Sequence, residues 1–582
     1  MEDLRLPTKL MLLVALLQGL ALLLLHQSVD FEFWPATAPP WLFSAYAAVI
    51  IGPTLYLLAV GTQNGRQLLS YILLFTLLCS LLAFYTGTQT APDESPRLAP
   101  LLVPMTFTLA LLAFKALMYI QVKTASEPFN YPQLFHYSWR NLLTLGLAVA
   151  FTMVTWGVLM LWAGLFSVIN IDFFDELFQE KWFYYPTLNL ALVLGIIIVR
   201  RLSVIVDTIK QLQQALLKYL LVLLIFVALI FLISLPFTGL APLWEKGPGS
   251  YLILWMQACI LFALNSVYQG DADERPYGLL LHRFIYLGLL LLPCYSALVF
   301  YGLSLRIEQY GWSVSRYWGI LAWLFLTLFS LGYAACIVRL KDHWISGLGR
   351  INVGMGWLLM VALILINSPL LDLRKMTVNN QLARIASGES APDDIDIHYL
   401  ANQLARPGYD AIAQLKTTYK DSHQALVLKL NRAYQNAPVD AVQDKQLVTE
   451  SIECLNACEL PAELATQIYT DLSENNYKLM QAKAFYALAV DPNQDMVADY
   501  LLLLEMTYGF DITLYVNSKA GWLALHTEQI ALKPDDTGRP LAERLGDLSI
   551  NYSAPQFQHM QIGELQIGVS LHGEAKHAGE RP

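Results

Sequence analysis

Two carboxylates, Asp30 and Glu32, stand two residues apart directly after the first apolar segment of the chain. Near a membrane surface, a carboxylate can deprotonate an acceptor group or bind a cation. Acidic and aromatic residues are also common at the membrane interface in proteins that catalyse nothing. The sequence therefore makes Asp30 and Glu32 the candidate catalytic residues of an enzyme, with an ordinary interfacial pair as the alternative.

A second group of potential ligands, Asp394, Asp396 and His398, lies in the last third of the chain. Carboxylates and imidazole bind metal ions, but no other histidine lies close in the sequence to complete a set of ligands. Aspartates at the start of a helix also stabilise the positive end of the helix dipole. We therefore expect a helix N-terminus here, and neither a bound metal ion nor a cofactor.

Lys115 is the basic residue that lies well inside a predicted membrane span, residues 101–121. A charge within a span often belongs to a binding site or a transport path. Lys115 is about six residues, or roughly 9 Å, from the cytoplasmic end of this span, and a lysine side chain can extend toward the interface. We expect it either to reach the interface or to join a polar path with Asn189 and Asn265.

The six cysteines divide into two groups. Four lie inside apolar segments, where a thiol behaves as a small buried hydrophobe. Cys454 and Cys458 lie outside such segments and form a possible structural pair. Oxidation of this pair requires an oxidising compartment, and two cysteines four apart on one helix are near the upper distance limit for a disulfide.

A glycine-rich stretch, residues 347–356, could be mistaken for a phosphate-binding loop. It lacks a preceding strand, a Walker lysine and a following Ser or Thr, which a nucleotide site requires. We interpret these glycines as positions of close packing between helices.

The composition predicts a membrane protein, because 56% of the residues are hydrophobic and only 14% are charged. A helix that crosses the hydrocarbon core needs about 20 apolar residues. Eleven segments meet this requirement: residues 8–26, 41–60, 68–87, 101–121, 141–169, 182–199, 219–240, 251–268, 284–305, 317–338 and 352–371. We therefore predict an all-α polytopic membrane bundle of about eleven transmembrane helices over residues 1–372.

The loops between these spans differ in their content of Lys and Arg. With the N-terminus in the cytoplasm, fourteen of these residues fall in cytoplasmic segments and five in the opposite loops. An excess of positive charge marks the cytoplasmic side of a membrane protein. Because the number of spans is odd, the C-terminal third is predicted to lie outside the cytoplasm.

The segment after the last span is predicted to be a soluble, mainly α domain with a small β element. Residues 373–508 show helix-like apolar spacing, and residues 509–572 alternate as strands do, with a hairpin expected across residues 517–521 and a last strand over residues 562–571. Residues 573–582 are predicted to be disordered. Residues 373–582 carry 17 Lys and Arg against 27 Asp and Glu, which excludes a nucleic acid as partner. The expected partners are membrane lipids and, through residues 373–508, another envelope protein.

Two stretches of sequence resemble a known family. One is Gln309-Tyr-Gly-Trp-Ser-Val-Ser-Arg316 with the preceding Arg275-Pro-Tyr-Gly-Leu, and the other is the junction from Asn379 to Arg384 with Asp394 to Tyr409. They resemble the bacterial membrane family catalogued as domain of unknown function 4153, over roughly residues 1–415. The resemblance implies a multi-pass protein of the bacterial inner membrane. It implies no activity and no catalytic residues.

Three functions remain open at this point, and the sequence does not decide whether the protein is an enzyme. The first is an envelope sensor, scaffold or assembly factor, favoured by the large external domain. The second is a transferase acting on a lipid-linked substrate, since such enzymes carry a catalytic or metal-binding carboxylate in the first outer loop, where Asp30 and Glu32 lie. The third is a transporter, which needs a hydrated path lined by polar residues from several spans.

Overall fold

The computed structural model of the chain forms two compact units, Met1–Gln381 (unit 1) and Leu382–Pro582 (unit 2). The structure describes residues 6–61, 65–92, 97–127, 129–240, 242–245, 249–268, 276–420, 422–434, 448–449, 451–455, 459–474, 478, 482, 484–492, 496–506, 509–518, 521–530, 560–562 and 565–567. Unit 1 contains the membrane helices, and unit 2 contains short helices and a β-sheet.

Eleven helices among the described residues are long and apolar enough to cross a membrane, and each overlaps one predicted span. They lie within α1 (Thr8–Asp30), α2 (Pro39–Ala59), α3 (Gly65–Thr88), α4 (Ala99–Thr124), α5 (Tyr131–Ser167), α7 (Lys181–Arg201), α8 (Ser203–Thr238), α10 (Gly249–Val267), α11 (Leu279–Tyr310), α12 (Val314–Leu340) and α13 (Ile345–Ile366). A helix satisfies its own backbone hydrogen bonds, as a chain surrounded by lipid must. The predicted polytopic helical fold is confirmed.

Shorter elements connect or follow these helices in unit 1. They are α6 (Phe173–Gln179), α9 (Pro242–Glu245), the 3₁₀ turns η1 (Lys341–His343) and η2 (Pro369–Leu371), and α14 (Leu373–Ala386), whose residues up to Gln381 belong to unit 1. The last span is predicted to end at residue 371, but its helix, α13, ends at Ile366. Pro369 begins the 3₁₀ turn η2 instead.

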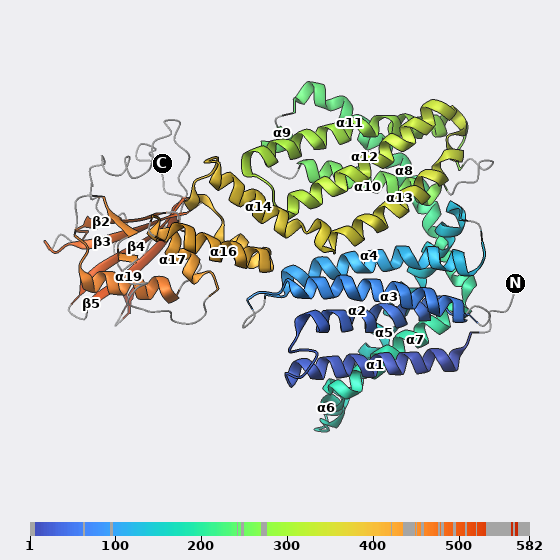
Figure 1. Ribbon diagram of the computed structural model, residues 1–582, viewed down its shortest axis with the longest axis horizontal. Helices are drawn as coiled ribbons and strands as arrows, with labels where there is room; N and C mark the ends of the chain where they lie inside the picture. The colour runs from blue at the N-terminus through green and yellow to red at the C-terminus, as the bar shows by residue number, and fades with distance from the viewer. Residues whose placement is uncertain are drawn as a thin grey trace. The chain divides into compact units, whose positions relative to one another are not determined.

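The spanning helices pack as two groups that share one helix. In the first group, α2 packs on α3, and α7 packs on both α1 and α5 (Figure 1). In the second group, α10 packs on α8 and α11 packs on α12. Helix α13 contacts α12 of the second group and also α4 and α5 of the first. This helix therefore joins the two groups.

Small residues allow close contacts between helices of the first group. A Cβ on Gly19 of α1 would lie 2.7 Å from the Cα of Pro186 in α7, and one on Gly195 of α7 would lie 2.9 Å from the Cα of Ala148 in α5. Within a membrane, such close approach provides the van der Waals contact that holds helices together. The positions of α1, α5 and α7 therefore depend on these glycines.

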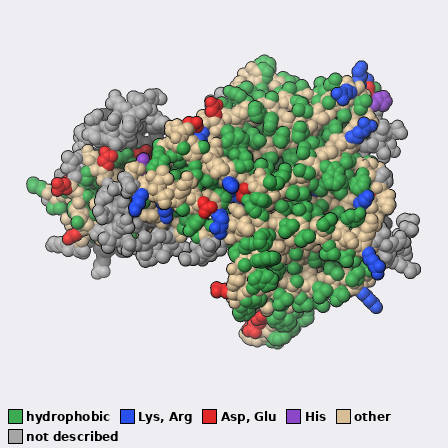
Figure 2. Space-filling model, viewed as in Figure 1, with side chains coloured by type: hydrophobic (Ala, Val, Ile, Leu, Met, Phe, Trp, Pro, Cys, Tyr) green, Lys and Arg blue, Asp and Glu red, His purple; other side chains and the backbone are tan. Residues whose placement is uncertain are grey.

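Lys and Arg side chains are distributed unevenly between the two ends of unit 1. Figure 2 shows hydrophobic side chains over the visible face of the helices and several Lys and Arg side chains along its right-hand edge, whereas the Lys and Arg near the middle of the view lie beside Asp or Glu. Arg66, Arg201 and Arg339 are exposed at helix ends that the alternation of the spans brings to the same side. Asp172, which precedes α6, and Glu176, within α6, are exposed at the opposite side. This distribution agrees with the loop count from the sequence.

Unit 2 contains a five-stranded sheet in which the strands follow chain order. Its described elements are η3 (Pro392–Asp394), α15 (Ile397–Gln403), α16 (Ala405–Tyr419), α17 (Gln424–Arg432), β1 (Ile452–Cys454), α19 (Ala462–Glu474), β2 (Ala484–Val490), β3 (Asp499–Met506), β4 (Gly509–Ser518), β5 (Gly521–Ile530), β6 (Met560–Ile562) and β7 (Leu565–Ile567). β1 and β2 are parallel, and the pairs from β2 to β5 are antiparallel. Helix α19 provides the crossover that a parallel pair requires.

The sheet begins earlier in the chain than predicted. Residues 373–508 are predicted to be helical, but β1, β2 and β3 lie within them. The sequences of β2 and β3 are nearly continuous apolar runs, and such runs do not show the alternation that identifies a strand. Periodicity alone therefore cannot distinguish them from buried helices.

Three expectations after residue 509 have different outcomes. The hairpin is confirmed, since β4 pairs with β5 and Ser518 lies opposite Gly521. The predicted last strand is two short strands, β6 and β7, with Ile562 opposite Leu565. The predicted disordered tail, residues 573–582, lies outside the described residues.

Candidate functional site

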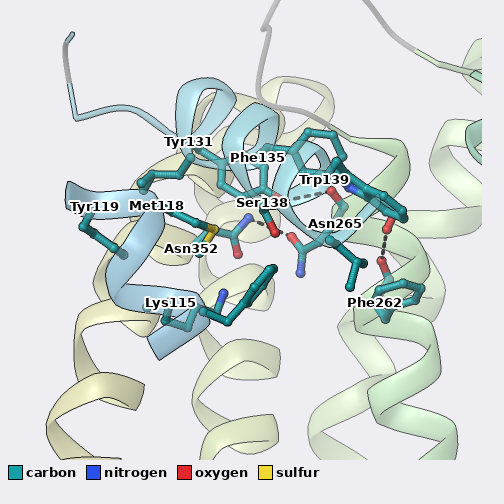
Figure 3. Close-up of a pocket in the computed structure, with 15 residues that line it drawn as sticks. Lys115, Met118, Tyr119, Tyr131, Phe135, Ser138, Trp139, Phe262, Asn265 and Asn352 are labelled. Atoms are coloured by element: carbon teal, nitrogen blue, oxygen red, sulfur yellow. Dashed lines mark hydrogen bonds between the residues drawn. The ribbon is translucent and has the colours of Figure 1, made fainter. Parts of the chain in front are cut away.

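A cavity of about 330 Å³ lies among α4, α5, α10 and α13 of unit 1 (Figure 3). Its volume is within the range of small-molecule sites, roughly 300–1,000 Å³. The lining residues are Phe114, Lys115, Met118, Tyr119, Tyr131, Leu134, Phe135, Ser138, Trp139, Leu142, Phe262, Asn265, Ser266, Asn352 and Gly356. Because α13 contacts α4 and α5 here, the cavity lies where the two helix groups meet.

The first turn of α5 fixes one wall of the cavity. The side chain of Asn130 caps this helix by accepting a hydrogen bond from the backbone N–H of Gln133 at 3.1 Å. Pro132 follows in the first turn, where a proline costs no hydrogen bond. Tyr131, held between these residues, donates its hydroxyl to the carbonyl of Asn265 at 2.8 Å. This bond links α5 to α10.

A hydrogen-bond network of three side chains connects α10, α12 and α13. The Asn352 amide donates from Nδ2 to Oδ1 of Asn265 at 2.7 Å. The Tyr333 hydroxyl lies 2.8 Å from the same Asn265 oxygen and also contacts Oδ1 of Asn352. Oδ1 of Asn265 accepts the hydrogen bonds of this network, so Nδ2 of Asn265 points away from it. Figure 3 shows this Nδ2 directed into the cavity. The network thereby sets the polarity of the wall.

A tyrosine and a glycine hold α4 against α13 beside the cavity. The hydroxyl of Tyr119 donates to the backbone carbonyl of Val353 at 3.1 Å. A Cβ on Gly356 would overlap this hydroxyl. The interpretation of the 347–356 stretch as a packing sequence agrees with this contact.

Lys115 extends into the cavity (Figure 3). Thr124, the end of α4, is nine residues further along, about 14 Å at 1.5 Å per residue. The ammonium group has no hydrogen bond or ion pair with any residue that the structure describes. Of the other two polar residues of the expected path, Asn265 lines the same cavity, whereas Asn189 donates to the carbonyl of Tyr185 in its own helix at 2.9 Å.

The candidate catalytic residues of the first outer loop lie apart from this cavity. Asp30 ends α1, and its carboxylate is 2.5 Å from the ammonium of Lys181 and 3.6 Å from Nε2 of His26. Glu32 is exposed in the following turn, at a backbone φ of 52°. Among the described residues, no hydrogen bond joins Asp30 to Glu32. Asp30 therefore belongs to an ion pair that ties α1 to α7.

The residues proposed as weak metal ligands lie at the start of α15. Asp396 caps this helix by accepting from the backbone N–H of Tyr399 at 2.8 Å. Asp394 ends the preceding 3₁₀ turn, and His398 is exposed in the first helical turn. Among the described residues, no group of three His, Cys, Asp or Glu side chains is arranged to hold a metal ion. The cap gives Asp396 a role in starting the helix.

The two cysteines of the tail fall at the end of β1. Cys454 is half-buried and disulfide-bonded. Cys458 lies outside the described residues. Cys79, Cys259, Cys294 and Cys336, the cysteines within spans, are free.

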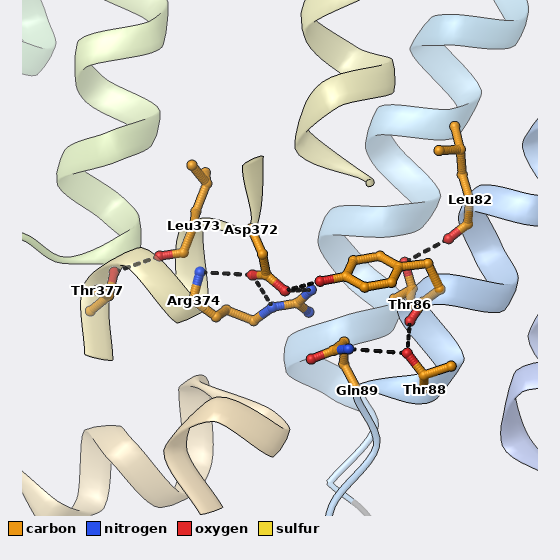
Figure 4. A network of polar contacts seen from close by, with 9 residues as sticks. Leu82, Thr86, Thr88, Gln89, Asp372, Leu373, Arg374 and Thr377 are labelled. Carbon is orange, nitrogen blue, oxygen red and sulfur yellow. Dashed lines mark hydrogen bonds and ion pairs between the residues drawn. The ribbon is translucent and has the colours of Figure 1, made fainter. Parts of the chain in front are cut away.

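A buried ion pair fixes the segment that follows the last span (Figure 4). Oδ1 of Asp372 accepts from the backbone N–H and Nε of Arg374 at 2.9 and 3.1 Å, and Oδ2 accepts from the hydroxyl of Tyr85 at 2.9 Å. Burial raises the pKa of Asp372, but the charge of Arg374 and these hydrogen bonds outweigh it and leave the pKa below its ordinary value. The network ties the start of α14 to α3.

Comparison with known families identifies the larger part of the chain. The family model described as Domain of unknown function (DUF4153) matches residues 12–415, more than half of the 582 residues. The chain belongs to the DUF4153 family. Neither a curated protein nor a solved structure matches it. The resemblance found in the sequence is confirmed, and the matched region contains every residue of the cavity.

Two of the stretches that resemble the DUF4153 family contact each other in unit 1. The backbone N–H of Trp312 donates to Oδ1 of Asn380 at 2.9 Å, and Nε2 of Gln381 donates to the carbonyl of Trp312 at 3.0 Å. Arg316 supports the same turn through the carbonyl of Gly311 at 2.7 Å. These residues hold the loop between α11 and α12 against α14.

The sequence did not single out Ser138, Tyr131 or Asn352 as site residues. Each lies in a segment where one polar residue among apolar ones is ordinary. The available signal was the occurrence of Asn265 and Asn352 inside two predicted spans, which is costly without a hydrogen-bond partner. Only the packing of α10 against α12 and of α12 against α13 reveals that these amides are each other's partners.

Proposed function

We propose that this protein is an envelope sensor or scaffold of the bacterial inner membrane, with a cytoplasmic N-terminus and unit 2 in the periplasm. Unit 2 binds another envelope protein through its helices, α15 to α19. The sorting of Lys and Arg between the two ends of unit 1 supports this orientation. The disulfide at Cys454 also supports it, because disulfides persist in oxidising compartments.

The observation that carries the proposal is the way in which the last span ends. Helix α13 lines the cavity through Asn352 and Gly356, and the segment after it is fixed by the ion pair of Asp372 with Arg374. Tyr85 connects this pair to α3. A change in helix packing within the membrane therefore reaches the start of α14, which leads in the sequence to unit 2. A sensor needs such a connection, because a change within the membrane must be passed to the part of the chain that binds the partner.

Alkaline phosphatase fusions test the orientation. A fusion after residue 582 should be active, and a fusion near Lys341 should be inactive. The opposite pattern would overturn the proposed topology.

Photo-crosslinking in cells tests the partner. A photoreactive residue at Asp410 of α16 or Glu463 of α19, both exposed, should form a discrete protein adduct. The control position is Leu74 of α3, which is 68% exposed on the apolar surface and should crosslink to lipid. Absence of a protein adduct at both unit 2 positions would contradict an interaction role for these helices.

A transferase remains a second candidate because His26 and Lys181 both lie beside the Asp30 carboxylate. An imidazole next to a carboxylate is suited to proton transfer. Asp30→Asn and Lys181→Gln both break the ion pair, but only the first removes the carboxylate. Loss of the cellular phenotype in Asp30→Asn alone would favour catalysis, whereas equal effects would assign the pair to structure. Replacing both Asp30 and Glu32 by Ala tests whether they are the catalytic pair. The replacement should abolish the phenotype if they are, and an unchanged phenotype would remove this candidate.

A further inference from the structure

The charged side chain that lines the cavity between α4, α5, α10 and α13 is a cation. Lys115 contributes this cation, and none of the described residues that line the cavity is Asp or Glu. The Nδ2 of Asn265 is a second donor, because its Oδ1 is occupied by the amide of Asn352 and the hydroxyl of Tyr333. Ser138 adds a hydroxyl from α5. The arrangement is complementary to an anion.

A charged Lys115 needs a partner that the described part of the protein does not provide. An unpaired ammonium within the hydrocarbon region is costly, and such charges usually pair with another group or line a polar cavity. The distance of about 14 Å to the end of α4 is too long for a lysine side chain to cover. A bound anion would satisfy Lys115 and Asn265 together.

The rest of the lining is suited to an apolar body. Met118, Phe135, Trp139 and Phe262 surround the polar groups with aromatic and aliphatic surface. A cavity of about 330 Å³ lies at the small end of ligand sites, which favours one apolar chain over two. Leu142 and Phe262 are 49% and 56% exposed on the apolar surface of the bundle. A ligand can therefore reach the cavity from the bilayer.

We propose that this cavity binds a single-tailed amphiphile with an anionic head, whose head group pairs with Lys115 and accepts a hydrogen bond from Asn265. The tail packs against the aromatic wall formed by α5 and α10. Carboxylate and phosphate heads share this chemistry. The site does not depend on the proposed orientation or on a partner for unit 2.

Photolabelling of the purified full-length protein in detergent tests the site. The probe is a palmitic acid analogue with a diazirine in its tail, and the labelled peptides are mapped by mass spectrometry. Label should appear on α4, α5, α10 or α13 at residues that line the cavity. Palmitate should compete with the probe at a concentration at least tenfold lower than hexadecanol does. Hexadecanol has a tail of the same length but no charge. Competition by monoacylglycerol phosphate distinguishes a phosphate head from a carboxylate.

Variants of α4 separate charge from folding. Lys115→Gln should weaken labelling at least tenfold, and Lys115→Arg should retain it because the charge is kept. The matched control is Lys123→Gln, an exposed cation on the same helix, which should label as the unmodified protein does. Ser138→Leu keeps the charge but fills the cavity, and should also reduce labelling. Each variant is compared only if it elutes as a single species on size exclusion.

Three results would overturn the proposal. They are equal competition by hexadecanol and the anionic amphiphiles, unchanged labelling of a folded Lys115→Gln, and label confined to residues outside the cavity. If Lys115→Gln fails to fold, the comparison of Ser138→Leu with the unmodified protein decides the outcome.

Discussion

The hydroxyl of Tyr85 is expected to control the stability of the start of α14. This hydroxyl donates to Oδ2 of Asp372 at 2.9 Å, while Arg374 occupies Oδ1. The side chain of Asp372 is only 3% exposed and that of Arg374 15%, so water cannot easily replace a lost donor. Tyr85→Phe removes this one hydroxyl and leaves the ion pair in place. We expect α14 to open more often in the variant.

The size of the effect follows from the charge on the acceptor. A hydrogen bond to a charged group contributes about 1.5–3 kcal/mol. Since about 1.4 kcal/mol corresponds to a factor of ten in an equilibrium constant, protection should fall by roughly 10- to 150-fold. Asp372→Asn should have a larger effect, because removing one member of a buried ion pair costs about 3–5 kcal/mol.

Hydrogen exchange of the backbone amides in residues 373–381 measures this opening. The control is Tyr71→Phe on the same helix, which removes a hydroxyl that bonds no described residue. The lowered pKa of Asp372 means that its contribution is present above the ordinary carboxyl pKa and is lost as the pH falls through the folded value. Protection attributable to Tyr85 should therefore be constant from pH 7 to pH 5. Unchanged exchange in Tyr85→Phe, or an equal loss in Tyr71→Phe, would refute the reasoning.

Three other predictions concern single contacts. Arg200 of α7 donates to the carbonyl of Leu57 in α2 at 3.1 Å and to that of Val60, which follows α2, at 2.8 Å, so Arg200→Gln should destabilise the protein by about 1.5–3 kcal/mol in a detergent unfolding titration. Gly195→Val should cost about 1–3 kcal/mol in the same titration, because its Cβ would press against Ala148, and a normal midpoint would contradict this close packing. If Cys454 and Cys458 are paired in the periplasm, a membrane-impermeant maleimide should label them in intact cells only after reduction. Labelling without a reductant would show that they are free.

The membrane bundle could be predicted from the sequence because its signal is strong and local. Each span is a run of apolar residues long enough to cross the bilayer, and all eleven are found as helices. The strands of unit 2 gave a weaker signal. β4 and β5 alternate and meet at a short turn, so their hairpin was predictable, whereas the apolar runs of β2 and β3 were not assignable from periodicity.

The cavity was predictable only in part. Lys115 and Asn265 are conspicuous because charged and amide side chains are rare within spans. Nothing in a single sequence states that residues 150 positions apart lie on facing helices, so the joint position of Lys115 and Asn265 depends on the packing around α13. The same limit explains Asp372, whose partner Tyr85 is 287 positions away.

Helix α13 is the element through which the cavity and the junction can influence each other. Asn352 lines the cavity, and the helix continues for fourteen residues, about 21 Å, to Ile366. Asp372, six residues beyond, is fixed to α3. A ligand that separates α4 from α13 must either bend this helix, move its far end or break the bond to Tyr85. Ligand-dependent exchange at residues 373–381 would therefore measure coupling directly, which proximity alone cannot establish.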